Sequence, residues 1–475
     1  MKNWPYILLT FLLIFIFTTS CAPFMPQVRS KPEGDLPTDF SLYGEGRERP
    51  EKWWEVFNAS DLNALIEKAF AGNPSLRATW ARLAQARALA VQTGANLYPD
   101  LTLNAGGSRS RQRVDGGDGT RHSVQTGKDY SLGLSSRYEL DLWGKIRSER
   151  EAALLEATAT REDVHTAGMS LAAEVTERWL RIISQRMQKN LLEKQLGTNE
   201  TYLELVELRY RKGMVSALDV YQQRQVVAKI QAQIPLVEAR EQLLLHELAV
   251  LLGKPPRSPL EIGHNALPAL EKIPPMGLPA DLLGNRPDVR AAGLRLKAAD
   301  WDVSTARANR LPSINLTGGL SYGSGQLDLL FNNWVLSLAS TLTAPIFDGK
   351  RRAAEVDRTQ AVVEQNLAIY RDTVLTAIKE VEDALVSESK EQEHITALRQ
   401  QMEAAKKALD EARTRYLKGI ADYLPVLTQL LSVQGLERDL IEQQTQQILY
   451  RVGLYRALGG TWTRDLQPGL GLRKG

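Results

Sequence analysis

The alternation of apolar and polar residues along the chain predicts four short β-strands, arranged as two pairs. In each segment apolar side chains alternate with polar or small ones, which is the period of a strand with one apolar face. The segments cover about 99–108 and 129–140, and again about 312–322 and 334–344. Each is close to the length of about ten residues with which a tilted strand crosses a bilayer. A pair of hairpins packed on helices in a water-soluble protein remains the alternative.

Aromatic residues near the ends of these segments favour the membrane interpretation. Strands that cross a membrane carry aromatic side chains at both lipid–water interfaces. The residues in such positions are Tyr98, Tyr138, Trp143, Tyr322, Trp334 and Phe347.

Most of the remaining pattern is helical, and two of the predicted helices are unusually long. No proline interrupts either long segment, and about 70 residues at 1.5 Å each form a rod of about 100 Å. Apolar residues recur in steps of three and four, which gives a helix one narrow apolar stripe for packing against other long helices. In the second long helix this stripe is Val363, Leu367, Tyr370, Val374, Ile378, Val381 and Leu385. Helices are expected at 74–97, 144–212, 217–252, 287–310, 349–418 and 423–458.

A tight turn is expected where each long helix ends and a return helix begins. Gly213 and Gly419 suit the left-handed residue that follows a helix C-terminus. Ser216 and Asp219, three residues apart, predict a capping box at the start of the first return helix. Asp422 is the corresponding capping candidate for the second.

The whole pattern of predicted helices and strands occurs twice in the chain, as an internal repeat. The matching segments are Asn73-Pro74 with Arg286-Pro287, Gly144-Lys145 with Gly349-Lys350, and Arg209 to Gly213 with Arg415 to Gly419. We therefore expect repeat 1 at 61–254, a linker or belt segment at 255–285, repeat 2 at 286–460 and a tail at 461–475. The first copy is longer because of a polar, glycine-rich stretch from Arg109 to Lys128, which is typical of a surface loop.

The N-terminus reads as an export signal followed by a lipid attachment site. Lys2 and the apolar stretch from Tyr6 to Phe17 have the charge and length of a signal peptide, which we place at 1–20. Cys21 is the only cysteine, so it has no partner for an internal disulfide. This junction resembles a bacterial lipoprotein processing site, with a lipidated segment at 21–60. In such lipoproteins a residue like Ala22 favours outer-membrane sorting. A spare thiol inside an uncleaved signal is the alternative.

Charge and composition argue against nucleic-acid binding and against catalysis. The formal net charge is +3, and charged residues make up 24% of the chain, which leaves no strong electrostatic footprint for nucleic acid. The five histidines, at 122, 165, 246, 264 and 394, form no cluster at ligand spacing. No phosphate loop or nucleophile elbow is present. We expect no enzyme activity and no cofactor apart from the covalent lipid on Cys21.

Four strands cannot close a membrane barrel by themselves. After Phe17 no apolar run is long enough for a membrane-spanning helix, so any crossing has to use strands. A transmembrane barrel needs at least about eight strands, and an open edge is intolerable in lipid. Two copies would give a barrel filled by side chains, whereas three would give twelve strands and room for a lumen. The chain is therefore expected to form a trimer around a shared conduit.

Several motifs resemble the TolC/OprM family of outer-membrane efflux proteins over residues 50–460. They are Leu278 to Leu283 with Arg286 to Val289, Ala308-Asn309 with Pro312, Phe347 to Lys350, and the two Arg-Tyr-x-x-Gly turns. The resemblance implies a membrane α+β fold with two internal repeats. Its outer-membrane β-barrel has four strands per protomer and twelve in the homotrimer, continued by a long periplasmic α-helical barrel. It also implies a periplasmic adaptor (membrane fusion protein) and an inner-membrane pump of the resistance-nodulation-division type as partners.

The resemblance assigns roles to the two turns. The residues that match the tips offered to the adaptor are Gly213, Ser216, Asp219, Gly419 and Asp422. The periplasmic aperture is expected at Leu424, which matches an apolar constricting ring, and at Thr428. Many relatives carry an aspartate where this chain has Thr428, and Pro425 replaces a second acidic position. We therefore expect a steric, apolar gate.

A periplasmic adaptor or scaffold lipoprotein is the rival interpretation, since it would also combine a signal, a lipidated cysteine and long helical hairpins. The strand pair inserted in each repeat discriminates against it. The exported substrate stays open: antibiotics, metal ions, dyes and secreted metabolites all fit a wide duct whose pump does the selecting.

Overall fold

The computed structural model describes residues 24–26, 40, 52–115, 122–270, 273, 279–460 and 462–467. The predicted signal peptide, Cys21 and residues 468–475 lie outside this part of the chain. The chain divides into two compact units. The sheet unit contains Leu83–Thr160 and Ala292–Tyr370, and the turn unit contains Gly34–Arg82, Arg161–Ala291 and Arg371–Gly475.

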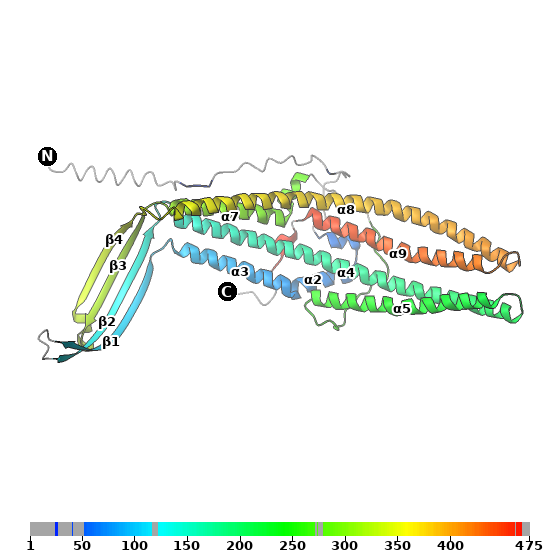
Figure 1. The fold of residues 1–475 in the computed structure, drawn as a ribbon, viewed down its shortest axis with the longest axis horizontal. Coiled ribbons are helices and arrows are strands. Elements are labelled where there is room, and N and C mark those ends of the chain that lie inside the picture. Colours follow the sequence, from blue (N-terminus) through cyan, green and yellow to red (C-terminus); the bar gives the residue numbers. More distant parts are fainter. Residues whose placement is uncertain are drawn as a thin grey trace. The chain divides into compact units, whose positions relative to one another are not determined.

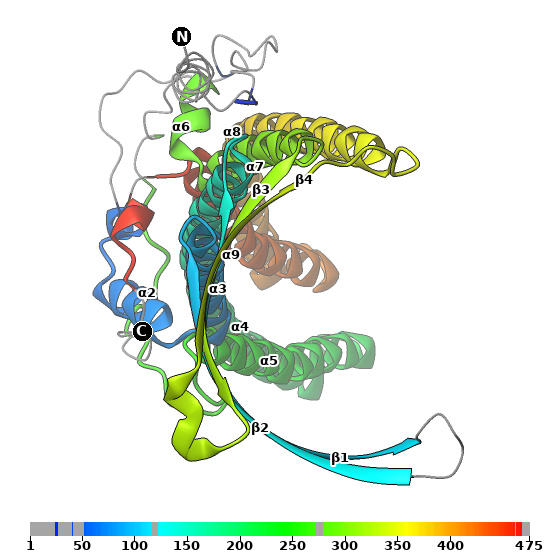
Figure 2. The same ribbon diagram turned by 90° about the vertical axis from the view of Figure 1, so that its left-hand side faces the viewer.

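An antiparallel sheet with the strand order β1-β2-β3-β4 lies in the sheet unit (Figure 1). Its strands are β1 (Asp100–Asp115), β2 (His122–Leu140), β3 (Ser313–Ser324) and β4 (Trp334–Thr343). The sheet is strongly curved, as Figure 2 shows. β2 and β3 come from different repeats and pair with each other, so β1 and β4 form the two edges.

The hairpin of repeat 1 is longer than the sequence indicates. β1 has 16 residues and β2 has 19, and their ladder runs from Asp100↔Arg137 to Asp115↔His122. The prediction of a surface loop from Arg109 to Lys128 is therefore wrong for all of its described residues, which are strand. The alternation of apolar side chains stops near Ala105, but the backbone ladder continues because hydrogen bonding between antiparallel strands does not depend on an apolar face.

Three pairs of equivalent helices follow the predicted segments closely. α3 (Pro74–Ala95) and α7 (Pro287–Ala308) precede the strand pairs. α4 (Lys145–Arg211) and α8 (Arg351–Leu417) have 67 residues each, which corresponds to a length of about 100 Å. α5 (Ala217–Leu251) and α9 (Leu424–Leu458) are the return helices, with 35 residues each. None of the helices in the described chain is long and apolar enough to span a membrane.

Short elements complete the turn unit. They are η1 (Trp53–Phe57), α2 (Ser60–Gly72), η2 (Pro279–Asp281), α6 (Leu282–Asn285) and η4 (Trp462–Asp465). η3 (Leu327–Asn332) connects β3 to β4 in the sheet unit. Trp54 of η1 packs edge-on against Trp462 of η4, with ring centroids 4.7 Å apart. The predicted linker has no helix or strand among its described residues before Pro279.

The structure defines the repeat more sharply than sequence matching does. α3 and β1 correspond to α7 and β3 at one offset in residue number, 213, whereas α4 corresponds to α8 at another, 206. The prediction that Gly144 matches Gly349 is therefore wrong by one position. Gly144 is equivalent to Lys350, since both precede the long helix with left-handed φ values of +72° and +69°. Their carbonyl groups accept the equivalent hydrogen bonds, from Ser148 N–H and Ala354 N–H.

The junctions between α3, α7 and the return helices are also equivalent. The Asn73 side chain donates a 2.9 Å hydrogen bond to the Leu251 carbonyl, and the Arg286 side chain donates a 3.0 Å bond to the Ala457 carbonyl. Both bonds satisfy carbonyl groups at the C-termini of α5 and α9, which lack partners within the helix. Each proline-initiated helix is thereby tied to the return helix of its own repeat.

Candidate functional site

The four-stranded sheet has one apolar face and one polar face. Residues directly opposite in a ladder point to the same side of a sheet, and Leu103, Leu134, Leu320 and Leu336 are successive partners across all four strands. The same face carries Leu101, Leu132, Tyr138, Leu140, Ile314, Leu316, Tyr322, Trp334, Leu338 and Leu342. This apolar face carries no charged residue over 101–105 of β1, over 130–140 of β2 and over 314–322 of β3. It also carries none on β4.

The opposite face is polar in the same register. Thr102, Ser135, Gly319 and Ser337 are successive partners across the four strands. Val335 and Ala339 are exceptions on this face, and Ser136 and Ser340 are hydroxyl-bearing exceptions on the apolar one. The other polar members are Asn104, Ser131, Arg137, Glu139, Ser313, Asn315, Thr317, Ser321, Thr341 and Thr343. An apolar face backed by a hydroxyl-rich face is the pattern of a sheet between lipid and water.

The apolar face is open in the single chain. Leu103 is 68% exposed and Leu338 is 86% exposed, and both lie on edge strands. Soluble monomers rarely expose contiguous apolar surface of this extent. The face therefore requires a lipid or protein environment.

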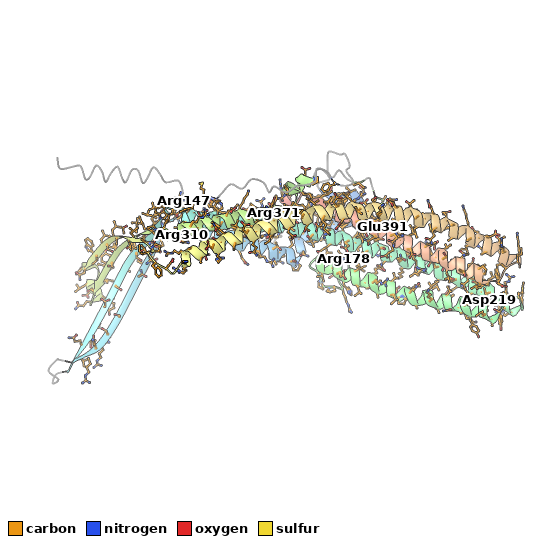
Figure 3. All side chains as sticks on the ribbon, turned by 45° about the horizontal axis from the view of Figure 1, so that its top comes forward. Arg147, Arg178, Asp219, Arg310, Arg371 and Glu391 are labelled. Atoms are coloured by element: carbon orange, nitrogen blue, oxygen red, sulfur yellow. The ribbon has the colours of Figure 1, made fainter. Side chains whose placement is uncertain are left out.

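The two helix turns lie together at one end of the turn unit, where Asp219 is labelled in Figure 3. Gly213 and Gly419 have φ values of +71° and +73°, as expected for residues that follow a helix C-terminus. Met214 N–H bonds to the Arg209 carbonyl and Ile420 N–H bonds to the Arg415 carbonyl, both at 2.9 Å. Both turns are therefore Schellman motifs, one at the end of each long helix.

The predicted capping box at the start of α5 is present. The Ser216 hydroxyl accepts a bond from Asp219 N–H, and the Asp219 carboxylate accepts one from Ser216 N–H at 2.9 Å. The prediction that Asp422 caps α9 is wrong. The N-cap position belongs to Tyr423 and no side chain caps this helix, because α9 begins at Leu424 and Asp422 precedes the N-cap.

Apolar side chains are exposed around both turns. Leu424 begins α9 and is 54% exposed. Thr428 is also exposed, but its hydroxyl donates to the Leu424 carbonyl at 2.9 Å and is engaged within the helix. The other exposed apolar side chains near the turns are Tyr210, Met214, Leu218, Tyr221, Leu417 and Ile420.

A buried polar network lies directly behind the turns, and sequence reasoning missed it. The Tyr423 hydroxyl donates to the Gln223 side-chain oxygen at 2.8 Å, and the Gln223 amide donates to Asn199. Asn199 in turn donates to the side chain of Gln434 at 3.1 Å, and Gln195 donates to the Gln434 carbonyl at 3.0 Å. The network joins α4, α5 and α9. Apolar periodicity gives no signal for it, because its members occupy positions on helix faces where apolar residues would be expected.

Burial fixes the protonation state at the head of this network. Burial raises the pKa of the Tyr423 phenol, and the neighbouring Tyr202, Tyr416 and Asp219 act in the same direction. The hydroxyl therefore stays protonated and donates its hydrogen bond throughout the physiological range. Across the described chain, no three His, Cys, Asp or Glu side chains gather closely enough to hold a metal ion.

Comparison with known proteins gives one consistent result. The sequence profile of a family described as outer membrane efflux protein matches residues 65–254 and 278–460, one match for each repeat. The chain is 34% identical over 420 residues to the pyoverdine export outer membrane protein OpmQ of Pseudomonas aeruginosa, covering 88% of both chains. It is 33% identical to the outer membrane protein OprJ of the same species, covering 86% of both.

Solved structures agree with these sequence matches. The outer-membrane channel OprN superposes with a TM-score of 0.83 at 28% identity, over 91% of this chain and 99% of that one. The open state of the MtrE outer membrane channel of Neisseria gonorrhoeae gives 0.81 at 27% identity, over 94% of this chain and 100% of that one.

Proposed function

We propose, from the premise that this chain belongs to the outer membrane efflux protein family, that three copies of it form one continuous duct and that each copy supplies four strands to its wall. The chain is an outer-membrane channel subunit of a tripartite efflux system. It conducts solutes passively, because an inner-membrane pump supplies the energy. We expect it to catalyse no reaction. The observation that carries the proposal is the two-faced sheet with its two unpaired edges.

Assembly follows from the strand count. Lipid contains no water to satisfy the backbone N–H and C=O groups along the outer edges of β1 and β4, so both edges need a strand partner. Twelve strands from three copies close a barrel whose polar face lines a lumen. Trp334 and Tyr322 lie at the same end of β4 and β3, where an interfacial aromatic girdle is placed.

The helix turns are the proposed docking surface for a periplasmic adaptor. The Schellman turns at Gly213 and Gly419 hold exposed apolar residues on a rigid frame, as a protein-binding surface requires. Ser216, Asp219 and Asp422 give this surface a polar rim. The same end would form the periplasmic aperture, with Leu424 as its apolar ring and Thr428 one helical turn behind.

Membrane attachment through Cys21 is part of the proposal. A single cysteine directly after an export signal supplies the thiol for a covalent lipid such as palmitate or a diacylglyceryl group. The anchor would hold the N-terminus of each copy at the outer membrane.

In this proposal the inner-membrane pump, and not the channel, selects the exported substrate. Relatives are named for pyoverdine export, toluene efflux and cation efflux, so one channel architecture accompanies chemically unrelated substrates. A wide hydroxyl-lined lumen fits this breadth, because it offers no pocket that selects a single solute.

Channel activity of the purified trimer tests the proposal. We expect the detergent-extracted protein to migrate as a trimer and to produce ion conductance in planar bilayers. A periplasmic adaptor would give neither. Leu338→Lys tests the assignment of the two faces, because a charge on the lipid face should prevent membrane insertion. The matched control is Ser337→Lys on the polar face, which should insert and alter ion selectivity. Equal insertion of both variants would contradict the assignment of the two faces.

A further inference from the structure

The hairpin of repeat 1 extends past β3 and β4, and its apolar face becomes basic there (Figure 2). β2 pairs with β3 only from Tyr130 onwards, whereas its ladder with β1 includes the residues before Tyr130. Alternate residues of a strand point to the same side, so Arg109 and Arg111 lie on the face that carries Leu103. Lys128 is the direct partner of Arg109, and all three cations are exposed. We call Arg109, Arg111 and Lys128 the basic cluster.

The charges of this hairpin are segregated by face. The face of the basic cluster carries no acidic residue over 105–113 of β1 and 124–132 of β2. The opposite face carries Asp129, and it has no lysine or arginine over 106–112 and 125–131. The basic cluster forms no ion pair with any residue that the structure describes. Like charges at neighbouring positions of a sheet repel each other, so an anion bound from outside the chain would stabilise this arrangement.

The internal repeat indicates the depth of the cluster. β1 corresponds to β3 at an offset of 213, and the two hairpin ladders coincide only if β2 corresponds to β4 at an offset of 206. The pair Arg109↔Lys128 is then equivalent to the pair Tyr322↔Trp334 of repeat 2. That aromatic pair occupies the proposed interfacial girdle. The equivalent cationic pair therefore belongs at the same level, beside the lipid headgroups.

Tyr130 marks this boundary on the hairpin of repeat 1. Its ring lies across Gly107, since a Cβ atom on Gly107 would be 3.4 Å from it. Gly107 lies between Ala105 and Arg109 on the same face. The face therefore passes from apolar residues through an aromatic ring to cations, which is the order of hydrocarbon, interface and headgroups in a bilayer. β1 begins after α3 and β2 ends before α4, so the cluster lies at the end of the hairpin remote from these helices.

We propose that the basic cluster binds the phosphate groups of lipid headgroups in the membrane leaflet that faces the exterior. This inference rests on the proposed function, in which the helices lie in the periplasm, and adds a lipid contact to it. The guanidinium groups of Arg109 and Arg111 can each donate two parallel N–H bonds to phosphate oxygens, and the Lys128 ammonium adds a compact charge. A soluble anion would meet only the cations. A phosphorylated lipid also lays its acyl chains on the adjoining apolar face, at Ala105 and Leu132, so the continuity of the two surfaces favours lipid.

Lipid binding by the full-length protein in detergent tests the proposal. The probe is a glycolipid with two phosphate groups, compared with the same glycolipid after enzymatic removal of its phosphates, and bound lipid is quantified by mass spectrometry. The charge-removal variant combines Arg109→Gln, Arg111→Gln and Lys128→Gln. The face-exchange variant combines Arg109→Ser with Ser110→Arg and Arg111→Gln with Gln112→Arg. It keeps the net charge and composition of the hairpin but moves both guanidinium groups to the polar face.

A third variant controls for the loss of net charge. Lys406→Gln, Lys407→Gln and Arg413→Gln remove three exposed cations from α8, far along the chain from the hairpin. A basic residue near an anionic lipid surface strengthens binding about fivefold. We therefore expect the charge-removal variant to bind the phosphorylated glycolipid at least about tenfold more weakly, and the face-exchange variant several-fold more weakly. The α8 variant should bind it like the unmodified protein, and high salt should abolish the preference for the phosphorylated form.

Four outcomes would overturn the proposal. They are equal binding of the two glycolipids, unchanged affinity of the charge-removal variant, unchanged affinity of the face-exchange variant, and displacement of the lipid by an equal concentration of inorganic phosphate, which would assign the cluster to a free anion. Sedimentation and bilayer conductance of the same preparations separate the two proposals. A protein that neither forms a trimer nor conducts ions defeats the proposed function, whereas a conducting trimer without a preference for phosphate defeats only the lipid site.

Discussion

The phenol of Tyr423 donates a 2.8 Å hydrogen bond to the side-chain oxygen of Gln223, and neither side chain is accessible to solvent beyond 1%. Tyr423 immediately precedes α9, and Gln223 lies in the second turn of α5. The bond therefore joins the start of one return helix to the start of the other. Gln223 extends the link to Asn199 of α4.

Removing the phenol should destabilise the turn unit. Tyr423→Phe leaves the Gln223 oxygen buried without a donor, and such a group costs about 1–3 kcal/mol. Chemical denaturation followed by tryptophan fluorescence measures the loss. Tyr221→Phe serves as the matched control, because Tyr221 is exposed and its loss should change stability by less than about 0.5 kcal/mol.

A double-mutant cycle identifies the cause. Gln223→Leu removes the same bond from the other side, so the double variant should cost less than the sum of the two single variants. Strict additivity would mean that the two side chains contribute independently and that the bond is not the source of the loss.

The two return helices should respond differently to loss of their polar residues at the turns. Ser216→Ala removes the cap of α5 and should lower stability by about 1 kcal/mol. Asp422→Ala should leave stability unchanged within about 0.5 kcal/mol, because Asp422 caps nothing. Thermal unfolding of both variants, without adaptor, checks the difference. An equal loss from both would show that Asp422 stabilises α9 by a route other than capping.

The sequence alone was sufficient to predict elements whose side chains signal their environment. The long helices, both Schellman glycines and the capping box follow from apolar periodicity and from residues with strict local preferences, such as Gly213 and Ser216. The apolar face of the sheet follows from alternation, and the ladder registers place it on one side in all four strands.

Other features depend on tertiary packing and leave no local pattern. The extension of β1 through Arg113 is a polar ladder that looks like a loop in sequence. Asp422 has the composition of a cap but lies just outside the capping position, since the chain starts α9 at Leu424. The Tyr423–Gln223 bond joins side chains 200 positions apart, which only the packing of α9 against α5 reveals.

Lys350 holds a backbone conformation that favours glycine. Its φ of +69° matches the +72° of Gly144 at the equivalent position in repeat 1. The left-handed conformation costs a side-chain-bearing residue about 1–2 kcal/mol, more than the roughly 0.4–1 kcal/mol that glycine costs through the unfolded chain. We therefore expect Lys350→Gly to raise stability by up to about 1 kcal/mol in denaturant titrations.

The reciprocal variant provides the control. Gly144→Ala should lower stability by at least about 1 kcal/mol, because alanine at φ of +72° gains strain without compensation. Destabilisation by Lys350→Gly would instead show that the lysine side chain contributes more than its backbone strain removes.

His165 makes stability depend on pH. Its Nδ1 lies 3.2 Å from the Thr463 hydroxyl, and burial lowers the pKa of the imidazole, opposed by Glu162 and reinforced by Arg161, Arg290 and Arg464. Because the folded-state pKa lies below the unfolded value of about 6.5, the unfolded chain binds the proton first as pH falls. The contribution of His165 to stability should be constant above that pH and decrease below it. Urea midpoints at several pH values should show a weaker decrease for His165→Asn, whereas the surface variant His394→Asn should behave as the unmodified chain.

Leu424, which we propose as the apolar ring of the aperture, should control conductance. Its side chain is 54% exposed at the first position of α9, and the proposed trimer brings three copies of it around the axis. Leu424→Ala shortens each of the three side chains, so we expect a higher single-channel conductance in planar bilayers. Leu417→Ala removes an apolar side chain of similar exposure from the end of α8 and should leave conductance unchanged. If Leu424→Ala conducts like the unmodified trimer, the constriction lies at other residues and the apolar ring assignment is wrong.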